Sequence, residues 1–159
     1  MSLDEALRLR AAGDHEQALQ LLVALSTAAP ADALLRFETA CVHDFLGREA
    51  QAVDHYLAAL AGALPDAQRL RAYVGLGSSY RTLGRYAEAE RTLLEGIVQF
   101  PQAPVLEAFL AMSEYNLGRP RAAIERLLML LARSSDDAEL RSYAAAIEFY
   151  ASRLDERWT

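Results

Sequence analysis

The sequence predicts an all-α protein, with four helix-turn-helix units in series and a capping helix after the fourth. The first observation is a set of glycines at intervals of 34, 37 and 34 residues: Gly13, Gly47, Gly84 and Gly118. The second is an alanine five residues after each glycine: Ala18, Ala52, Ala89 and Ala123. The third is that apolar residues recur three and four apart between these marks, whereas no useful stretch alternates as a strand would.

Each turn glycine is predicted to end the first helix of its unit, because glycine adopts the left-handed backbone of a helix C-cap without steric cost. The second helix of each unit is predicted to end at a proline or a polar run: Pro30, Pro65, Pro101 and the serines and aspartates of 134–137. The chain is therefore predicted to be one domain, 1–159, with repeats at about 1–32, 33–69, 70–103 and 104–137.

The segment after the fourth unit, residues 137–155, is predicted to form one amphipathic helix. Solenoids need such a terminal element, because the last unit otherwise leaves an apolar flank open to water. Asp136 or Asp137 is expected to cap its N-terminus. Trp158, beyond this helix, is expected either to fray or to dock on a neighbouring subunit. The apolar stripe of the capping helix is Leu140, Ala144, Ile147, Ala151 and Leu154.

The composition excludes several classes of protein. A chain that is 53% hydrophobic and 24% charged is globular, and its formal charge of -6 argues against nucleic acid as a partner, because phosphate binding requires a positive field. No apolar run approaches the roughly 18 residues of a membrane span, and the acidic start "MSLDEALRLRAAGD" does not read as a secretory signal. The single cysteine, Cys41, allows no intrachain disulfide and fits a reducing cytoplasm. All 16 basic residues are arginine, a bias that a GC-rich bacterial genome produces without functional demand.

No catalytic, cofactor or metal site is predicted. The three histidines are scattered, and the run "CVHD", with Cys41, His43 and Asp44, lacks the second ligand pair of a metal site. His43 is instead expected to pack between helices. The run "GLGSSY" at 75–80 lacks the third glycine and the preceding strand of a dinucleotide fingerprint.

The third unit, Leu70–Ala103, carries the most complete set of signature residues: Tyr73, Leu76, Gly77, Tyr80, Gly84, Tyr86, Ala89, Leu93, Gly96 and Pro101. With these residues the unit resembles a tetratricopeptide repeat, and the whole chain is similar to bacterial free-standing tetratricopeptide domains of about this size. The other units depart from the pattern, since His43 and Glu114 stand where the third unit has Tyr80.

The resemblance implies a right-handed α-α superhelix that binds a protein or peptide, with no catalysis and no cofactor. It also implies that the first helices line a concave groove. Arg71 and Arg81 are expected to pair there with an acidic residue or a terminal carboxylate of the partner. Apolar side chains of the partner are expected to stack on Phe37, Tyr115 or Phe149. The full set of predicted groove residues is Phe37, Cys41, Asp44, Arg71, Val74, Ser78, Arg81, Ala108, Met112, Tyr115, Ser142 and Phe149.

Two alternatives remain open at this point. In one, Arg71 and Arg81 are solvated surface charges, and the phenylalanines pack between neighbouring repeats rather than facing a partner. In the other, the chain is a self-associating module, and its groove or capping helix is buried in a homodimer.

Overall fold

The computed structural model describes residues 2–158, and within them it has ten helices and no strand, which confirms the all-α prediction. Within each of the two units described below, the helices pack in chain order, as expected of a helical repeat solenoid. None of the described helices combines the length and the apolar character needed to cross a bilayer. The chain divides into two compact units, Met1–Arg85 (unit 1) and Tyr86–Thr159 (unit 2), and each is described by itself.

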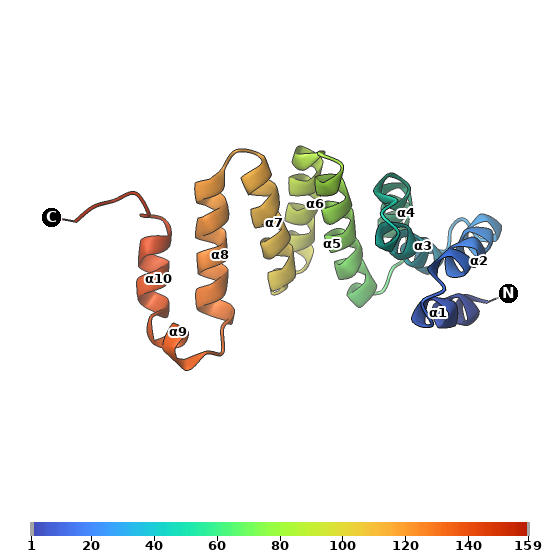
Figure 1. Cartoon of the computed structure of the whole chain (residues 1–159), viewed down its shortest axis with the longest axis horizontal. Helices are drawn as coiled ribbons and strands as arrows, with labels where there is room; N and C mark the ends of the chain where they lie inside the picture. The colour runs from blue at the N-terminus through green and yellow to red at the C-terminus, as the bar shows by residue number, and fades with distance from the viewer. Residues whose placement is uncertain (1, 159) are drawn as a thin grey trace. The chain divides into compact units, whose positions relative to one another are not determined.

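Unit 1 contains two helix hairpins and one further helix. Successive helices contact each other, and α3 also contacts α5, so these two first helices of neighbouring repeats lie side by side (Figure 1). This contact is what the groove prediction requires of unit 1. The helices of unit 1 are α1 (Leu3–Ala11), α2 (His15–Ala28), α3 (Ala33–Phe45), α4 (Glu49–Ala61) and α5 (Asp66–Thr82).

Unit 2 contains the other five helices. Here α6 packs on α7 and α7 on α8, and Figure 1 shows α8 between α7 and α10, with the short α9 at the bend between α8 and α10. The helices of unit 2 are α6 (Tyr86–Gln99), α7 (Pro104–Asn116), α8 (Pro120–Ser134), α9 (Ala138–Ser142) and α10 (Ala144–Ala151).

The four turn glycines end the first helices as predicted. All four have positive φ, between 70° and 89°, and no other residue type in the described chain does. In the second hairpin, the N–H of Gly47 bonds the carbonyl of Asp44 at 3.0 Å, and the N–H of Arg48 bonds the carbonyl of His43 at 2.9 Å. These two bonds form a Schellman motif, and the same pair recurs at the other three glycines. The repeat period of the sequence is therefore the spacing of four identical turns.

The capping segment differs from the prediction, because it is two helices rather than one helix over 137–155. Asp137 caps α9 as expected, its Oδ1 accepting the N–H of Leu140 at 2.9 Å. The helix is then interrupted at Tyr143, whose N–H is shared between the carbonyls of Glu139 and Leu140, at 3.3 and 3.2 Å. A shared bond of this kind tightens the turn and ends α9. The predicted stripe is half-buried or buried up to Ala151, where α10 ends, and Leu154 beyond it is exposed.

In three of the hairpins, side chains four residues before and eight residues after the turn glycine join the two helices, and we call them the closing pair. In the first hairpin these are Leu9 and Leu21, which belong to one apolar cluster. In the second, His43 and His55 stack with ring centroids 5.4 Å apart and an interplanar angle of 23°. In the fourth they are an ion pair of Glu114 and Arg126. The position is thus fixed by the fold, whereas its chemistry differs between hairpins.

The histidine closing pair is held in the neutral form. His43 is buried, and this burial, with the nearby Arg48, lowers its pKa below the ordinary 6.5. Burial also lowers the pKa of His55, with further contributions from His43 and Arg36. A lowered pKa means that the folded chain binds protons less readily than the unfolded chain does, so the stability gained by the neutral pair is lost as the pH falls.

We therefore expect the free energy of unfolding to decrease as the pH is lowered below about 6.5, the ordinary histidine value, and through the lowered pKa values of the pair. Urea titrations at a series of pH values measure this. The variant His43→Leu/His55→Leu places leucines at both positions, as in the first hairpin. Its free energy of unfolding should depend less on pH below about 6.5 than that of the wild-type chain. An equal slope in the wild-type chain and the double leucine variant would contradict the assignment.

Candidate functional site

The predicted groove residues fall in both units, and we describe them as two surfaces. The unit-1 face consists of Phe37, Cys41, Asp44, Arg71, Val74, Ser78 and Arg81. The unit-2 face consists of Ala108, Met112, Tyr115, Ser142 and Phe149.

The structure brings the α3 and α5 residues of the unit-1 face together, with one correction. The guanidinium carbon of Arg71 lies 5.6 Å from the ring centroid of Phe37, so the two helices meet here through a cation–π contact. Phe37, however, is 0% exposed, and its other ring neighbour is Tyr56. A partner therefore has no surface of Phe37 to stack on. The residue is a core side chain between helices, as in the alternative that the sequence left open.

A polar cluster joins two residues of this face, Cys41 and Asp44, to Tyr56 of α4 and Ser79 of α5. The carboxylate of Asp44 accepts two hydrogen bonds, from the hydroxyl of Ser79 at 3.2 Å and from that of Tyr56 at 3.3 Å. The Tyr56 hydroxyl also lies 3.8 Å from the Cys41 sulfur. Because these residues come from α3, α4 and α5, the cluster fixes the positions of three helices at once.

Burial raises the pKa values of two ionisable residues in this cluster, Cys41 and Asp44. Burial, and to a smaller extent the nearby Glu38, raises the pKa of the Cys41 thiol to about 11, whereas Tyr56 and Arg71 oppose the shift. A thiol with this pKa is protonated at neutral pH and is a poor nucleophile. Burial likewise raises the pKa of Asp44, against the hydrogen bonds from Ser79 and Tyr56. The hydrogen bonds of the Asp44 carboxylate therefore join α3 to α4 and α5, and the Cys41 thiol beside them is not activated.

Two arginines of α5 give the unit-1 face its charge. Among the residues that the structure describes, neither Arg71 nor Arg81 forms an ion pair. Arg71 is exposed, and Arg81 is half-buried with its Nε atom inaccessible to water and without a hydrogen-bond partner. Buried polar atoms are usually paired, so this Nε has an unmet demand for an acceptor. Val74 and Ser78 lie on the same helical face as these arginines and are half-buried.

The unit-2 face is apolar and open. Met112 and Tyr115 of α7 are 42% and 65% exposed, and Ala108 precedes them on the same helical face. Phe149 of α10 is 48% exposed. Ser142, predicted on the same helix as Phe149, instead lies in α9, where its hydroxyl donates to the carbonyl of Glu139 at 2.7 Å. The exposed surface of this face is therefore mainly methionine and aromatic.

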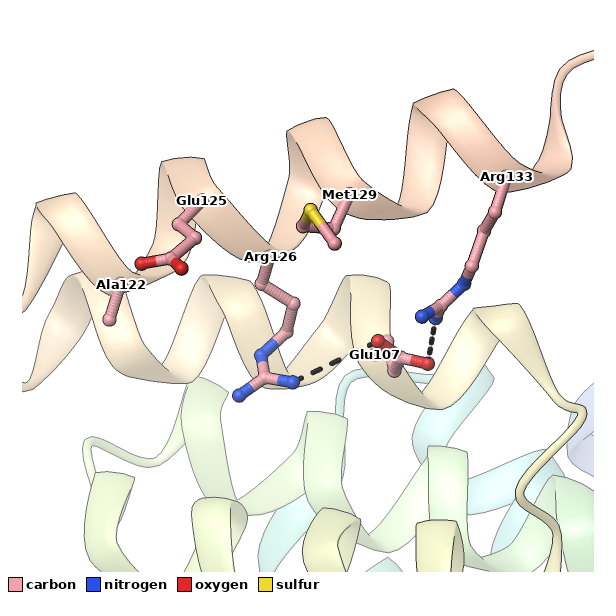
Figure 2. Close-up of a pocket in the computed structure, with 6 residues that line it drawn as sticks. All are labelled: Glu107, Ala122, Glu125, Arg126, Met129 and Arg133. Carbon is pink, nitrogen blue, oxygen red and sulfur yellow. Dashed lines mark hydrogen bonds and ion pairs between the residues drawn. The ribbon is translucent and has the colours of Figure 1, made fainter. Parts of the chain in front are cut away.

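A separate hollow lies between α7 and α8, and none of the predicted groove residues lines it. Its volume is about 410 Å³, and a neighbouring hollow of about 280 Å³ shares Glu107 and Arg133 with it. Figure 2 shows Arg126 and Arg133 both directed toward Glu107, which lies between them. These charges already satisfy one another, so the hollow is a surface feature of an ion-pair network. The described residues contain no group of three or more ligand side chains placed to hold a metal ion.

Sequence reasoning missed the charged pairs that cross between helices. Arg126 binds the buried Glu114 through Nε at 3.0 Å and Nη2 at 2.8 Å, and these bonds raise the pKa of Arg126. Arg10 of α1 is bound to the buried Glu38 of α3. The signal for the first pair was present, because a glutamate stands where two other units have tyrosine or histidine.

The family model described as tetratrico peptide repeat matches residues 33–154, from the start of α3 to beyond the end of α10. The matched region leaves out α1 and α2. The comparison with curated proteins found no match.

Proposed function

Because the chain belongs to the tetratricopeptide repeat family, whose members generally serve as non-catalytic scaffolds for protein–protein interaction, we propose that it is a cytoplasmic adaptor. In this proposal it binds an acidic segment of another protein on the unit-1 face. The observation that carries the proposal is the pair of arginines on α5, Arg71 and Arg81, which have no carboxylate partner within the described chain.

Arg71 is preorganised for such a ligand. Its contact with the Phe37 ring holds the guanidinium on the face, so less side-chain freedom is lost when a carboxylate binds. Arg81 offers a second cation, ten residues further along α5. A guanidinium can bind a carboxylate of the partner through two parallel hydrogen bonds.

The test is a library of acidic and carboxylate-terminated peptides, with the affinity of each binder measured by calorimetry. We expect Arg71→Glu/Arg81→Glu to lower the affinity for these peptides by at least about tenfold, because two attractive charges become repulsive. Arg91→Glu/Arg141→Glu reverses two other exposed arginines and changes the net charge equally, so it serves as the matched control. Equal affinity in the two double variants would exclude the unit-1 face as the binding surface.

Self-association is the second candidate, and the exposed apolar residues of the unit-2 face favour it. In this case the face would be buried against a second copy in a symmetric dimer. Light scattering over a range of concentrations separates the two candidates, because only the second predicts a mass that rises toward twice the chain mass.

A further inference from the structure

Three aromatic rings meet at the end of unit 2. Phe149 and Tyr150 are neighbours on α10 with ring centroids 5.2 Å apart at an angle of 82°. Trp158, which follows α10, lies 5.2 Å from Tyr150 and 6.1 Å from Phe149. Edge-to-face and tilted pairs at these distances are attractive. Trp158 therefore packs on a residue of the predicted groove, rather than fraying as one of the two expectations had it.

The segment Arg153–Trp158 is folded back onto unit 2 by several contacts. The Arg153 guanidinium carbon lies 4.3 Å from the Phe149 ring centroid, and its Nη1 donates to the Phe149 carbonyl at 2.6 Å. Asp155 forms an ion pair of 3.0 Å with Arg121 of α8. The N–H of Glu156 bonds the carbonyl of Arg153 at 3.0 Å. The segment thus binds its own chain through an aromatic side chain and an acidic one.

These contacts are solvent-exposed, so a ligand can displace the segment from them. The rings of Phe149, Tyr150 and Trp158 are 48%, 49% and 58% exposed, whereas the core ring of Tyr56 is 3% exposed. The side chains of Arg121 and Asp155 are 65% and 69% exposed, and ion pairs at such positions are weak. A ligand with the same chemistry can therefore compete for the same surface.

We propose that Phe149, Tyr150 and Arg121 form a recognition surface for a protein segment with an aromatic side chain close after an acidic one. The chain's own Trp158 and Asp155 occupy this surface and compete with the partner. The partner's aromatic ring packs against the rings of Phe149 and Tyr150, as Trp158 does now. Its carboxylate forms an ion pair with Arg121, as Asp155 does now. This proposal rests on the proposed function in so far as the occupant is another protein. It adds a second binding surface to the unit-1 face. It also adds an intramolecular competitor, the segment with Asp155 and Trp158, which lowers the affinity for the partner.

The test uses the chain's own segment as the probe. A peptide with the sequence SRLDERW, blocked at both ends and carrying fluorotryptophan, is titrated with the full chain and followed by fluorine NMR. We expect Trp158→Ala to bind this peptide about tenfold more tightly than the wild-type chain does, because a tethered competitor acts at an effective concentration of about millimolar. Adding Phe149→Ala/Tyr150→Ala to Trp158→Ala should abolish binding. Equal binding by the wild-type chain and Trp158→Ala would overturn the proposal.

Two controls keep the result interpretable. Tyr143→Ala in the Trp158→Ala background removes an equally exposed aromatic residue next to α10 and should leave peptide binding unchanged. Arg71→Glu/Arg81→Glu should also leave peptide binding unchanged. The two proposals are therefore tested independently, and either one can be wrong while the other is right. Peptide binding that survives the loss of Phe149 and Tyr150 would place the site elsewhere and overturn the proposal.

A measurement on the wild-type chain covers the case in which a variant fails to fold. Trp158 is the only tryptophan, so its fluorescence reports this contact alone. We expect acrylamide to quench Trp158 less than it quenches the free peptide, and to the same extent at all protein concentrations. Quenching equal to that of the free peptide would show that Trp158 does not pack on α10. Quenching that changes on dilution would show that Trp158 binds a second copy, and either result overturns the intramolecular assignment.

Discussion

Replacing Arg126 by alanine should lower the free energy of unfolding by about 2 to 3 kcal/mol, because it leaves the buried carboxylate of Glu114 without its cation. Glu114 is 5% exposed and receives both of its charged hydrogen bonds from Arg126. This decrease lies below the roughly 3 to 5 kcal/mol of fully buried pairs, since the Arg126 side chain is 29% exposed and water can partly replace it. Chemical denaturation at neutral pH measures the change.

The matched control replaces both members of this closing pair. Glu114→Leu/Arg126→Leu introduces the closing pair of the first hairpin, Leu9 and Leu21, and leaves no charge buried. We expect this double variant to be more stable than Arg126→Ala, because replacing a buried pair by apolar side chains of similar volume is often neutral. If the double variant were as unstable as the single one, lost packing rather than the stranded carboxylate would be the cause.

Replacing Gly75 by alanine should destabilise the chain by about 2 kcal/mol, although alanine is the better helix former by about 1 kcal/mol. A Cβ atom at this position would lie 2.4 Å from both Cζ and the hydroxyl oxygen of Tyr56. The Tyr56 ring cannot move aside freely, because it is buried and its hydroxyl bonds the carboxylate of Asp44. The added methyl group therefore displaces a ring that joins three helices.

A double-mutant cycle tests this cause. Tyr56→Leu places at α4 the residue found at the same register of the first and third repeats, Leu22 and Leu93, and removes the clash. We expect Gly75→Ala to cost clearly less in the Tyr56→Leu background than in the wild-type chain. Thermal or urea unfolding of the four chains gives the coupling. A Gly75→Ala chain more stable than the wild type would mean that the ring has room to move.

The sequence alone was sufficient for the repeated features of the fold. Glycine has a specific backbone role at a helix C-cap, so four glycines in register predict four turns of the same geometry, and the structure has four Schellman motifs. The interruption at Tyr143 could not be predicted in this way, because no glycine or proline marks it. It depends on how the N–H of Tyr143 is shared between two carbonyls.

The candidate site was harder to predict, because register fixes the face of a residue but not its depth. Phe37 and Arg71 both lie on the predicted face, yet Phe37 is fully buried and Arg71 covers it. The need for glycine at position 75 comes from the ring of Tyr56 on another helix. Such contacts depend on the sizes of side chains on two different helices. The spacing of residues along one helix does not predict them.

The differing chemistry of the closing pairs has a consequence for the order in which the hairpins open. Acid adds charge to the two stacked imidazoles and so loosens α3 from α4. High ionic strength screens the partly exposed guanidinium that holds α7 to α8, and it leaves the leucines between α1 and α2 untouched. Since neighbouring units of a solenoid are stabilised largely by local contacts, the weakest joint of this molecule is set by the solution around it rather than by its sequence alone.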